Sequence, residues 1–168
     1  MKQFQFNDFP NVTGSRVSLR QITDNDIPDL IEISFYDAVR AENVHQAAEM
    51  QARINQDCLD GNSIHWGIVD NETNRMVGTC GYYRGLDKGE GELGCVLLPQ
   101  HYGKGYMTAG MSLAIDFGLH TMGLKRIWAA TSLQNGPAIK LLERLGFVKT
   151  ADVSDDEIEY EWRKNSDL

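Results

Sequence analysis

The order of hydrophobic and polar residues predicts a chain of short strands and helices. Residues 16–22 alternate between the two classes, which is typical of a β-strand. A helix capped by Thr23 or Asp24 is predicted next, because the following apolar residues share one helical face: Ile27, Leu30, Ile31 and Ile33. The pattern breaks over residues 35–43. A sparser helical spacing over residues 44–58 predicts a surface helix placed to cover a cleft.

The middle of the chain has the pattern of a strand meander followed by a long helix. The predicted strands are residues 64–69, 76–83 and 92–98. The first two are joined by Asp70-Asn71-Glu72-Thr73-Asn74, which is typical of a hairpin. Residues 106–120 carry two adjacent helical rows of apolar side chains and predict a helix with a broad buried face.

The last third alternates strand, helix and two strands. The predicted strands are residues 125–130, 147–150 and 158–162. The helix between them opens at Asn135, has Pro137 in its first turn and ends at Gly146. The connection between strands 92–98 and 125–130 is long enough for a right-handed parallel crossover.

These elements predict an α/β (α+β) fold in one domain, residues 1–168. We expect a mixed, mostly antiparallel sheet of about 6–7 strands flanked by about four helices. The expected core spans residues 14–162, and the tail 163–168 is expected to be loose. A chain of 168 residues is long enough to bury a sizeable core.

Composition and charge exclude several classes of function. The hydrophobic fraction of 42% and the charged fraction of 24% are ordinary for a globular protein. A net charge of −8 and a pI of about 4.9 argue against binding to nucleic acid or to an anionic membrane. No apolar run is long enough for a membrane span, and residues 1–11 do not have the pattern of a signal peptide. We therefore expect a cytoplasmic protein with reduced thiols at Cys58, Cys80 and Cys95.

One stretch, residues 97–108, predicts a phosphate site. It joins a strand end, a proline, two glycines around Lys104 and the start of the long helix. Helix N-termini carry unpaired N–H groups and the positive end of the helix dipole, and glycine lets a phosphate approach the backbone. A P-loop is excluded because Gly105 follows Lys104, and the dinucleotide fingerprint fails because Thr108 replaces its third glycine.

The residues of this stretch also resemble a known family. Gln100-x-x-Gly103-x-Gly105 is similar to the acyl-CoA signature of the GCN5-related N-acetyltransferases (GNAT). Asn135-Gly136-Pro137-Ala138, followed by Leu141-Leu142-Glu143-Arg144-Leu145-Gly146-Phe147, resembles that superfamily's second motif. Arg16-Val17-Ser18-Leu19-Arg20, with Thr23-Asp24-x-Asp26, resembles the RimJ/RimL branch, which acetylates the N-termini of ribosomal proteins.

The resemblance implies that acetyl-CoA binds along the third meander strand and the glycine turn. It implies contacts from Val96, Leu97, Leu98, Gln100, His101, Tyr102, Gly103, Lys104, Gly105, Tyr106, Met107, Thr108, Asn135, Ala138 and Lys140. The N–H groups from Tyr102 or Gly103 to Met107 would cradle the pyrophosphate. The strand edge 96–98 would pair with the pantetheine arm, and an N–H near Val96 or Leu97 would polarise the thioester carbonyl. Asn135 also fits a simple helix cap, Lys140 a solvated lysine and His101 a surface residue.

The resemblance implies a general base at Glu92, because acetyl transfer needs a neutral amine. The alternative is a solvated carboxylate at the strand end, and Glu90 is the next candidate. The sequence departs from the branch at Ala138, where serine is usual, so no side chain there can protonate the leaving thiolate. Water, Ser132 or Cys95 could substitute.

The expected reaction is direct acetyl transfer to a primary amine in a ternary complex. A protein N-terminal amine is the first choice of acceptor, and a small amine (polyamine, antibiotic or amino-acid-like) is the alternative, with residues 35–62 forming the acceptor cleft. A non-catalytic acyl-CoA-binding module is the alternative of another class. The four histidines lack metal-like spacing, so no metal is expected. The acids near the C-terminus are a solvated edge or a surface that attracts a cationic acceptor, and a homodimer is an open option.

Overall fold

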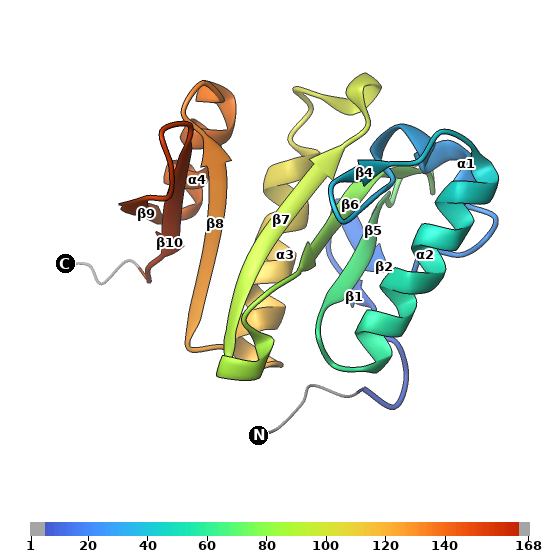
Figure 1. Cartoon of the computed structure of the whole chain (residues 1–168), viewed down its shortest axis with the longest axis horizontal. Coiled ribbons are helices and arrows are strands. Elements are labelled where there is room, and N and C mark those ends of the chain that lie inside the picture. The colour runs from blue at the N-terminus through green and yellow to red at the C-terminus, as the bar shows by residue number, and fades with distance from the viewer. Residues whose placement is uncertain (1–5, 165–168) are drawn as a thin grey trace.

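The computed structural model describes residues 6–164 and contains α-helices on both faces of a mixed β-sheet (Figure 1). The helices are α1 (Ile27–Leu30), α2 (Val44–Leu59), α3 (Tyr106–His120) and α4 (Gly136–Leu145). The strands are β1 (Val12–Thr13), β2 (Val17–Arg20), β3 (Phe35–Tyr36), β4 (Val39–Arg40), β5 (Ile64–Asp70), β6 (Met76–Tyr82), β7 (Glu90–Leu97), β8 (Arg126–Ser132), β9 (Phe147–Asp152) and β10 (Glu157–Trp162). Short 3-10 turns lie at η1 (Ile31–Ile33), η2 (Leu86–Lys88) and η3 (Pro99–His101).

Eight strands form one sheet in the order β1-β2-β5-β6-β7-β8-β10-β9. Neighbouring strands are antiparallel except β7 and β8, which run parallel and are connected through α3. The predicted parallel crossover and the fold class are therefore confirmed. The sheet has one strand more than expected because β1 is two residues long, too short to produce a period-2 pattern.

Two hydrophobic clusters lie on opposite faces of the sheet. The larger one packs α3 and α4 against the strands and includes Trp66 and Tyr82, both fully buried. Tyr82 donates its hydroxyl to the Ala114 carbonyl of α3 at 2.6 Å, which satisfies the polar end of a buried ring. The smaller cluster packs α1 and α2 against the other face. The two clusters hold the strand ends and the start of α3 in fixed positions.

The long helix and its successor follow the predicted boundaries. Helix α3 spans the predicted residues 106–120, and its Gly110 lies where a Cβ would come within 2.9 Å of Ile68. Helix α4 begins after Asn135, whose side chain accepts from the Ala138 N–H at 3.2 Å. It ends at Gly146, which has φ of 100°.

The first helix differs from its prediction. Helix α1 ends at Leu30, and the residues that follow it form η1. The N-cap position is Asp26 rather than Thr23 or Asp24, and its side chain makes no capping bond. Instead the Asp26 carboxylate accepts from Arg20 at 2.8 Å and from the Thr23 N–H at 2.8 Å. An ion pair with the preceding strand therefore replaces the cap.

The segment without a sequence pattern, residues 35–43, contains a small hairpin. Strands β3 and β4 pair in antiparallel fashion around Asp37 and Ala38, which have φ of 50° and 62°. Positive φ at both central positions fits a tight hairpin turn, which glycine or asparagine usually occupies. Of the predicted tail, residues 163–164 have no regular structure and residues 165–168 lie outside the described residues.

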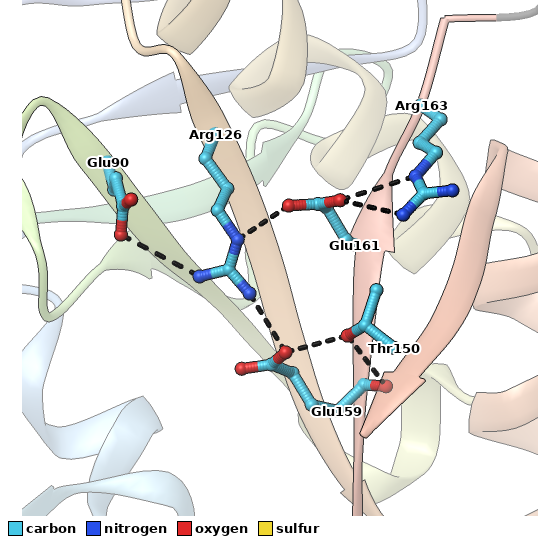
Figure 2. Close-up of polar contacts among 6 residues, drawn as sticks. All are labelled: Glu90, Arg126, Thr150, Glu159, Glu161 and Arg163. Carbon is cyan, nitrogen blue, oxygen red and sulfur yellow. Dashed lines mark hydrogen bonds and ion pairs between the residues drawn. The ribbon is translucent and has the colours of Figure 1, made fainter.

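A charged network lies where β7 and β8 still pair (Figure 2). Arg126 of β8 contacts Glu90 of β7, with 3.7 Å between Nη1 and Oε2, and also Glu159 and Glu161 of β10. Thr150 donates to Glu159 at 2.6 Å. Two members of the C-terminal acidic cluster therefore balance an arginine inside the sheet. The others are exposed: Asp152, Asp155, Asp156 and Glu157.

Candidate functional site

Strand β7 has an open edge over most of its length. In the described part of the chain, β7 pairs with β8 at Glu90, Gly91 and Glu92 only. Beyond these residues β8 pairs with β10, and the two parallel strands move apart (Figure 1). Residues 93–97 still pair with β6 on their other side. We call the gap between β8 and residues 93–97 of β7 the split. Among residues 6–164, it leaves one row of β7 backbone groups without a partner strand.

The register identifies which backbone groups face the split. Glu92 exchanges hydrogen bonds with residues 83 and 84 on the β6 side, and the Leu98 N–H donates to Val77. In an antiparallel pair, backbone groups alternate in direction along a strand. The N–H and C=O groups of Leu93, Cys95 and Leu97 therefore face the split. A backbone N–H donor was expected near Val96 or Leu97. The Val96 N–H faces β6, so the N–H groups of Cys95 and Leu97 are the candidates that face the split.

The glycine loop follows β7 and leads into α3. Gly103 and Gly105 have φ of 73° and 82°, in the left-handed region that favours glycine. A Cβ on Gly103 would meet nothing within 4 Å, so this side of the loop is open. The first helical N–H groups of α3 lack partners within the helix, and Gly105 provides no side-chain cap. We call residues 102–108 the cradle.

The side chains of the cradle differ in their exposure. Gln100, Tyr102 and Lys104 are exposed, whereas Met107 and Thr108 are half-buried. His101 packs edge-on against Tyr106, with ring centroids 5.7 Å apart. Burial and the nearby charge of Lys104 lower the His101 pKa, so this ring is neutral at neutral pH. Lys104 therefore supplies the positive side chain within the loop.

A second cation beside the cradle comes from the far end of the chain. The Arg16 guanidinium lies 4.7 Å from the centre of the Tyr106 ring, and its Nη1 is 2.7 Å from the position of a Cβ on Gly105. Tyr106 donates to Asp70 at 3.0 Å. Arg16 is not among the binding residues predicted from the sequence. No local signal could have identified it, because ninety positions separate it from Tyr106.

The start of α4 lies beyond the end of β8. Asn135 and Lys140 are exposed, and Ala138 is half-buried. The cap formed by Asn135 confirms the helix-cap interpretation of this residue. Ser132 donates to the Gln134 side chain at 2.8 Å and is exposed. Residues 136–139, the first turn of α4, include no side chain that could donate a proton.

Glu92 lies at the point where β7 and β8 part. It pairs with Trp128 in the parallel register, and its carboxylate is 3.6 Å from the Arg84 Nε. Its side chain is 24% exposed, so it is shielded but reachable from solvent. Period-2 alternation puts it on the same face of β7 as Gly94 and Val96. Glu90, the second carboxylate, belongs to the Arg126 network instead.

A pocket of about 490 Å³ lies on that face of the sheet. Its floor includes Gly94, Cys95 and Val96 of β7, and its walls come from α1, η1, the β3–β4 hairpin and α2. Residues of the segment 35–62 thus line a cavity, and its use as the acceptor cleft stays a prediction. Its size is typical of pockets for small molecules.

Two side chains on the pocket floor form a close pair. The Tyr83 hydroxyl is 2.7 Å from the His65 Nδ1. The Tyr83 ring lies over Gly81 and Gly94, which face each other across β6 and β7, and a Cβ on either would come within 2.9 Å of it. Neither residue lies in a recognisable motif, so the sequence alone does not identify the pair.

Both members of this pair are uncharged at neutral pH. Desolvation lowers the pKa of His65 to about 4 and raises the pKa of Tyr83 well above its usual value, although Tyr83 is still 37% exposed. Cys95 lies opposite Cys80 in the β6–β7 register, and a hydrogen bond in which the Cys95 thiol donates to Cys80, together with burial, raises the Cys95 pKa well above its ordinary value. Cys95 is therefore a thiol at neutral pH and a poor nucleophile.

Within residues 6–164, no three His, Cys, Asp or Glu side chains gather where they could hold a metal ion. The helices of the same region include none long and apolar enough to cross a membrane.

Comparisons with known proteins agree with this geometry. The family model of the acetyltransferase (GNAT) domain matches residues 16–148. The chain is 35% identical to the uncharacterized N-acetyltransferase p20 of Bacillus licheniformis over 116 residues, which are 68% of this chain and 65% of p20. The match therefore spans slightly less than two thirds of that relative. It is 29% identical to the uncharacterized N-acetyltransferase YoaA of Bacillus subtilis, over 84% of each chain.

Solved structures share the fold at low sequence identity. The ribosomal-protein-S5-alanine acetyltransferase of Vibrio fischeri is 18% identical with a TM-score of 0.76, over 94% of this chain and 98% of that one. The spermidine/spermine N-acetyltransferase SpeG of Vibrio cholerae, in mutant form, is 18% identical with a TM-score of 0.74, over 88% and 94%. The chain belongs to the acetyltransferase (GNAT) domain family.

Proposed function

We propose that this protein transfers the acetyl group of acetyl-CoA to a primary amine, directly and in a ternary complex. The observation that carries the proposal is the open edge of β7, residues 93–97, which ends at the cradle. A strand edge that continues into a glycine loop and a helix N-terminus fits a ligand made of an amide-rich arm and a pyrophosphate. A pocket on the face of the same strand leaves room for an acceptor.

Acetyl-CoA would bind mainly to the backbone. The pantetheine amides would pair with the groups of Leu93, Cys95 and Leu97 that face the split. The pyrophosphate would lie on the N–H groups of the cradle, with Lys104 and Arg16 as nearby cations. The open space above Gly103 is where a phosphate can approach, because no Cβ occupies it.

The chemistry follows from these positions. The amine nitrogen attacks the thioester carbonyl, and an N–H of Cys95 or Leu97 stabilises the oxyanion. Glu92 accepts the proton that the amine must lose, directly or through a water. The C–S bond then breaks, and CoA leaves as a thiolate that takes a proton from water, since Ala138 offers none. The raised pKa of Cys95 argues against an acetylated cysteine intermediate.

A protein N-terminal amine is the acceptor that the resemblance to the RimJ/RimL branch favours. The structural neighbours include proteins named for a ribosomal-protein substrate and for spermidine, so both acceptor classes occur on this fold. A small-molecule amine is therefore the second candidate.

One observation favours a different class of function. The first turn of α4 has Ala138 where a hydroxyl could protonate the leaving group. A chain that binds acyl-CoA without turning it over would need no such group. We keep this alternative because it makes a clear experimental difference.

The test is release of free thiol from acetyl-CoA in the presence of peptide, small-amine and polyamine acceptors, combined with calorimetry of acetyl-CoA binding. Thiol release that depends on an acceptor, with one acetyl group added per thiol, supports the proposal. Tight binding without turnover for every acceptor overturns it in favour of the binding module. Absence of binding contradicts both functions.

A further inference from the structure

The pocket that would receive the acceptor has walls that are mostly apolar. It contacts β7 at Gly94, Cys95 and Val96, so a bound molecule reaches the strand on which the thioester would lie. The apolar lining residues come from β2–α1, η1, the β3–β4 hairpin and α2: Ile22, Ile27, Leu30, Ile33, Phe35, Ala38, Ala47, Met50 and Ile54. Such walls favour a ligand whose body is apolar.

Few charges are available to balance a cation inside this pocket. Its lining carboxylates are Asp37, in the turn of the β3–β4 hairpin, and Asp57, on α2. Asp57 already accepts from the Tyr36 hydroxyl at 2.9 Å. Arg84 adds a positive charge to the lining, next to Glu92. A second cationic centre of a ligand would have to reach Asp37 or Asp57, because along the rest of the apolar walls it would be uncompensated, which is costly.

The floor carries one polar group close to β7. The Tyr83 ring lies over Gly81 and Gly94, and its hydroxyl meets the His65 Nδ1 at 2.7 Å. A phenol oxygen has one proton and two lone pairs, and the bond to the imidazole uses one of these three. At least one lone pair stays free for an N–H donor, whichever ring nitrogen of His65 carries the proton. Because burial keeps His65 neutral, this pair does not repel an amine.

We propose that the acceptor is a primary amine on an apolar body without a second cationic centre, and that the Tyr83 hydroxyl, held by His65, positions the amine nitrogen. This inference rests on the proposed acetyl transfer and goes further by naming the class of acceptor. Tyr83 contacts the substrate, whereas His65 acts through Tyr83 as a positioning residue.

The first test compares two acceptors of equal length. Hexylamine and 1,6-diaminohexane differ only in the second amine, which would lie within the pocket. We expect kcat/KM for hexylamine to exceed that for the diamine by about tenfold, because the second ammonium must lose water. A peptide with leucine as its first residue should also be preferred to spermidine. A preference for the diamine and for spermidine overturns the proposed acceptor class.

The second test removes the hydroxyl. Tyr83→Phe should raise KM for hexylamine by about fivefold, the usual effect of one lost hydrogen bond, with a smaller change in kcat. The dissociation constant of acetyl-CoA should not change. Tyr160→Phe is the matched control, because Tyr160 is buried on β10 away from the pocket. His65→Ala should reproduce the KM effect, and His65→Asn, which retains a hydrogen-bonding group, should restore part of it.

The outcomes separate this inference from the proposed function. If no amine supports thiol release, acetyl transfer itself is wrong. If amines are acetylated but Tyr83→Phe leaves the KM of every amine unchanged, the role of Tyr83 is wrong and the transferase stands. A Tyr83→Phe protein that loses acetyl-CoA binding as well also contradicts a role limited to the acceptor. In that case the acceptor comparison on the unmodified protein still tests the acceptor class.

Discussion

The cradle follows the end of β7 and the pocket covers one face of the same strand, yet the two are built from different parts of the chain. The cradle consists of consecutive residues, 102–108, and presents backbone N–H groups at the start of α3. The pocket collects side chains from α1, the β3–β4 hairpin, α2 and three strands of the sheet. A backbone site tolerates most side chains but not a Cβ in the wrong place, whereas a side-chain site depends on each residue that lines it.

This difference separates the two halves of the proposed reaction. The amides and phosphates of CoA, which are the same for every acyl group, suit recognition by backbone groups. The acceptor pocket is where family members with the same fold can differ in substrate. Substitutions in the two regions should therefore change different kinetic constants, and the following predictions test that separation.

Glu92→Gln should have the largest effect, because the proposed role of Glu92 is to accept the proton of the amine rather than to bind either substrate. We expect kcat at neutral pH to fall about a hundredfold. The loss should shrink at high pH, where the free amine is already neutral. The acetyl-CoA dissociation constant should be unchanged.

Glu90→Gln is the control for this charge change, because Glu90 contacts Arg126 rather than the pocket. A pH–rate profile that Glu92→Gln does not alter, or an equal loss in Glu90→Gln, would remove Glu92 from the mechanism.

His65 should make the free energy of unfolding of the protein depend on pH. His65 has a pKa of about 4 in the folded protein and about 6.5 in the unfolded chain, so the unfolded chain binds the proton more strongly. Its contribution to stability is complete above pH 6.5 and is lost as the pH falls toward 4. We expect the free energy of unfolding in urea to drop by about 2 kcal/mol from this group between pH 7 and pH 5.

His65→Gln should reduce this pH dependence by the same amount. If the two proteins lose stability in parallel between pH 7 and pH 5, His65 is not the group responsible.

Gly103→Ala should weaken acetyl-CoA binding by about tenfold, because a Cβ would occupy the open side of the cradle. Gly123→Ala is a matched control. Gly103 and Gly123 have φ of 73° and 68°, and a Cβ on either would meet nothing within 4 Å. Both variants should lose about 1 kcal/mol of stability from the left-handed backbone. Calorimetry that finds equal acetyl-CoA affinity in the two variants contradicts the cradle.

Asn135→Ala should have the smallest effect. Asn135 and Asn43 each cap a helix, by accepting from Ala138 at 3.2 Å and from Gln46 at 2.9 Å. Each alanine variant should lose about 1 kcal/mol of stability in thermal or urea unfolding. Only Asn135→Ala should also weaken acetyl-CoA binding, by about threefold, if its side chain contacts the arm as well. Identical acetyl-CoA affinities in both variants would mean that Asn135 only caps the helix.

Features that depend on a few consecutive residues could be predicted from the sequence. The glycine loop, the start of α3 and the cap and end of α4 follow from the preferences of Gly, Pro and Asn at defined backbone positions. The helix over residues 106–120 has its predicted boundaries for a second local reason: two adjacent apolar rows specify one buried helical face. The predicted first helix begins too early, because Asp26 pairs with Arg20, outside the helix, in place of the cap expected at Thr23 or Asp24.

The sequence by itself therefore determined the fold class, the strand that leads into the cradle and the family of the chain. Only the tertiary structure decided which β7 groups face the split, that Arg16 lies beside Tyr106, and that Tyr83 and His65 form the pocket floor. The physical reason is that local backbone conformation depends on neighbouring residues. A contact between distant side chains depends instead on strand order and register, which many weak interactions across the whole core set together.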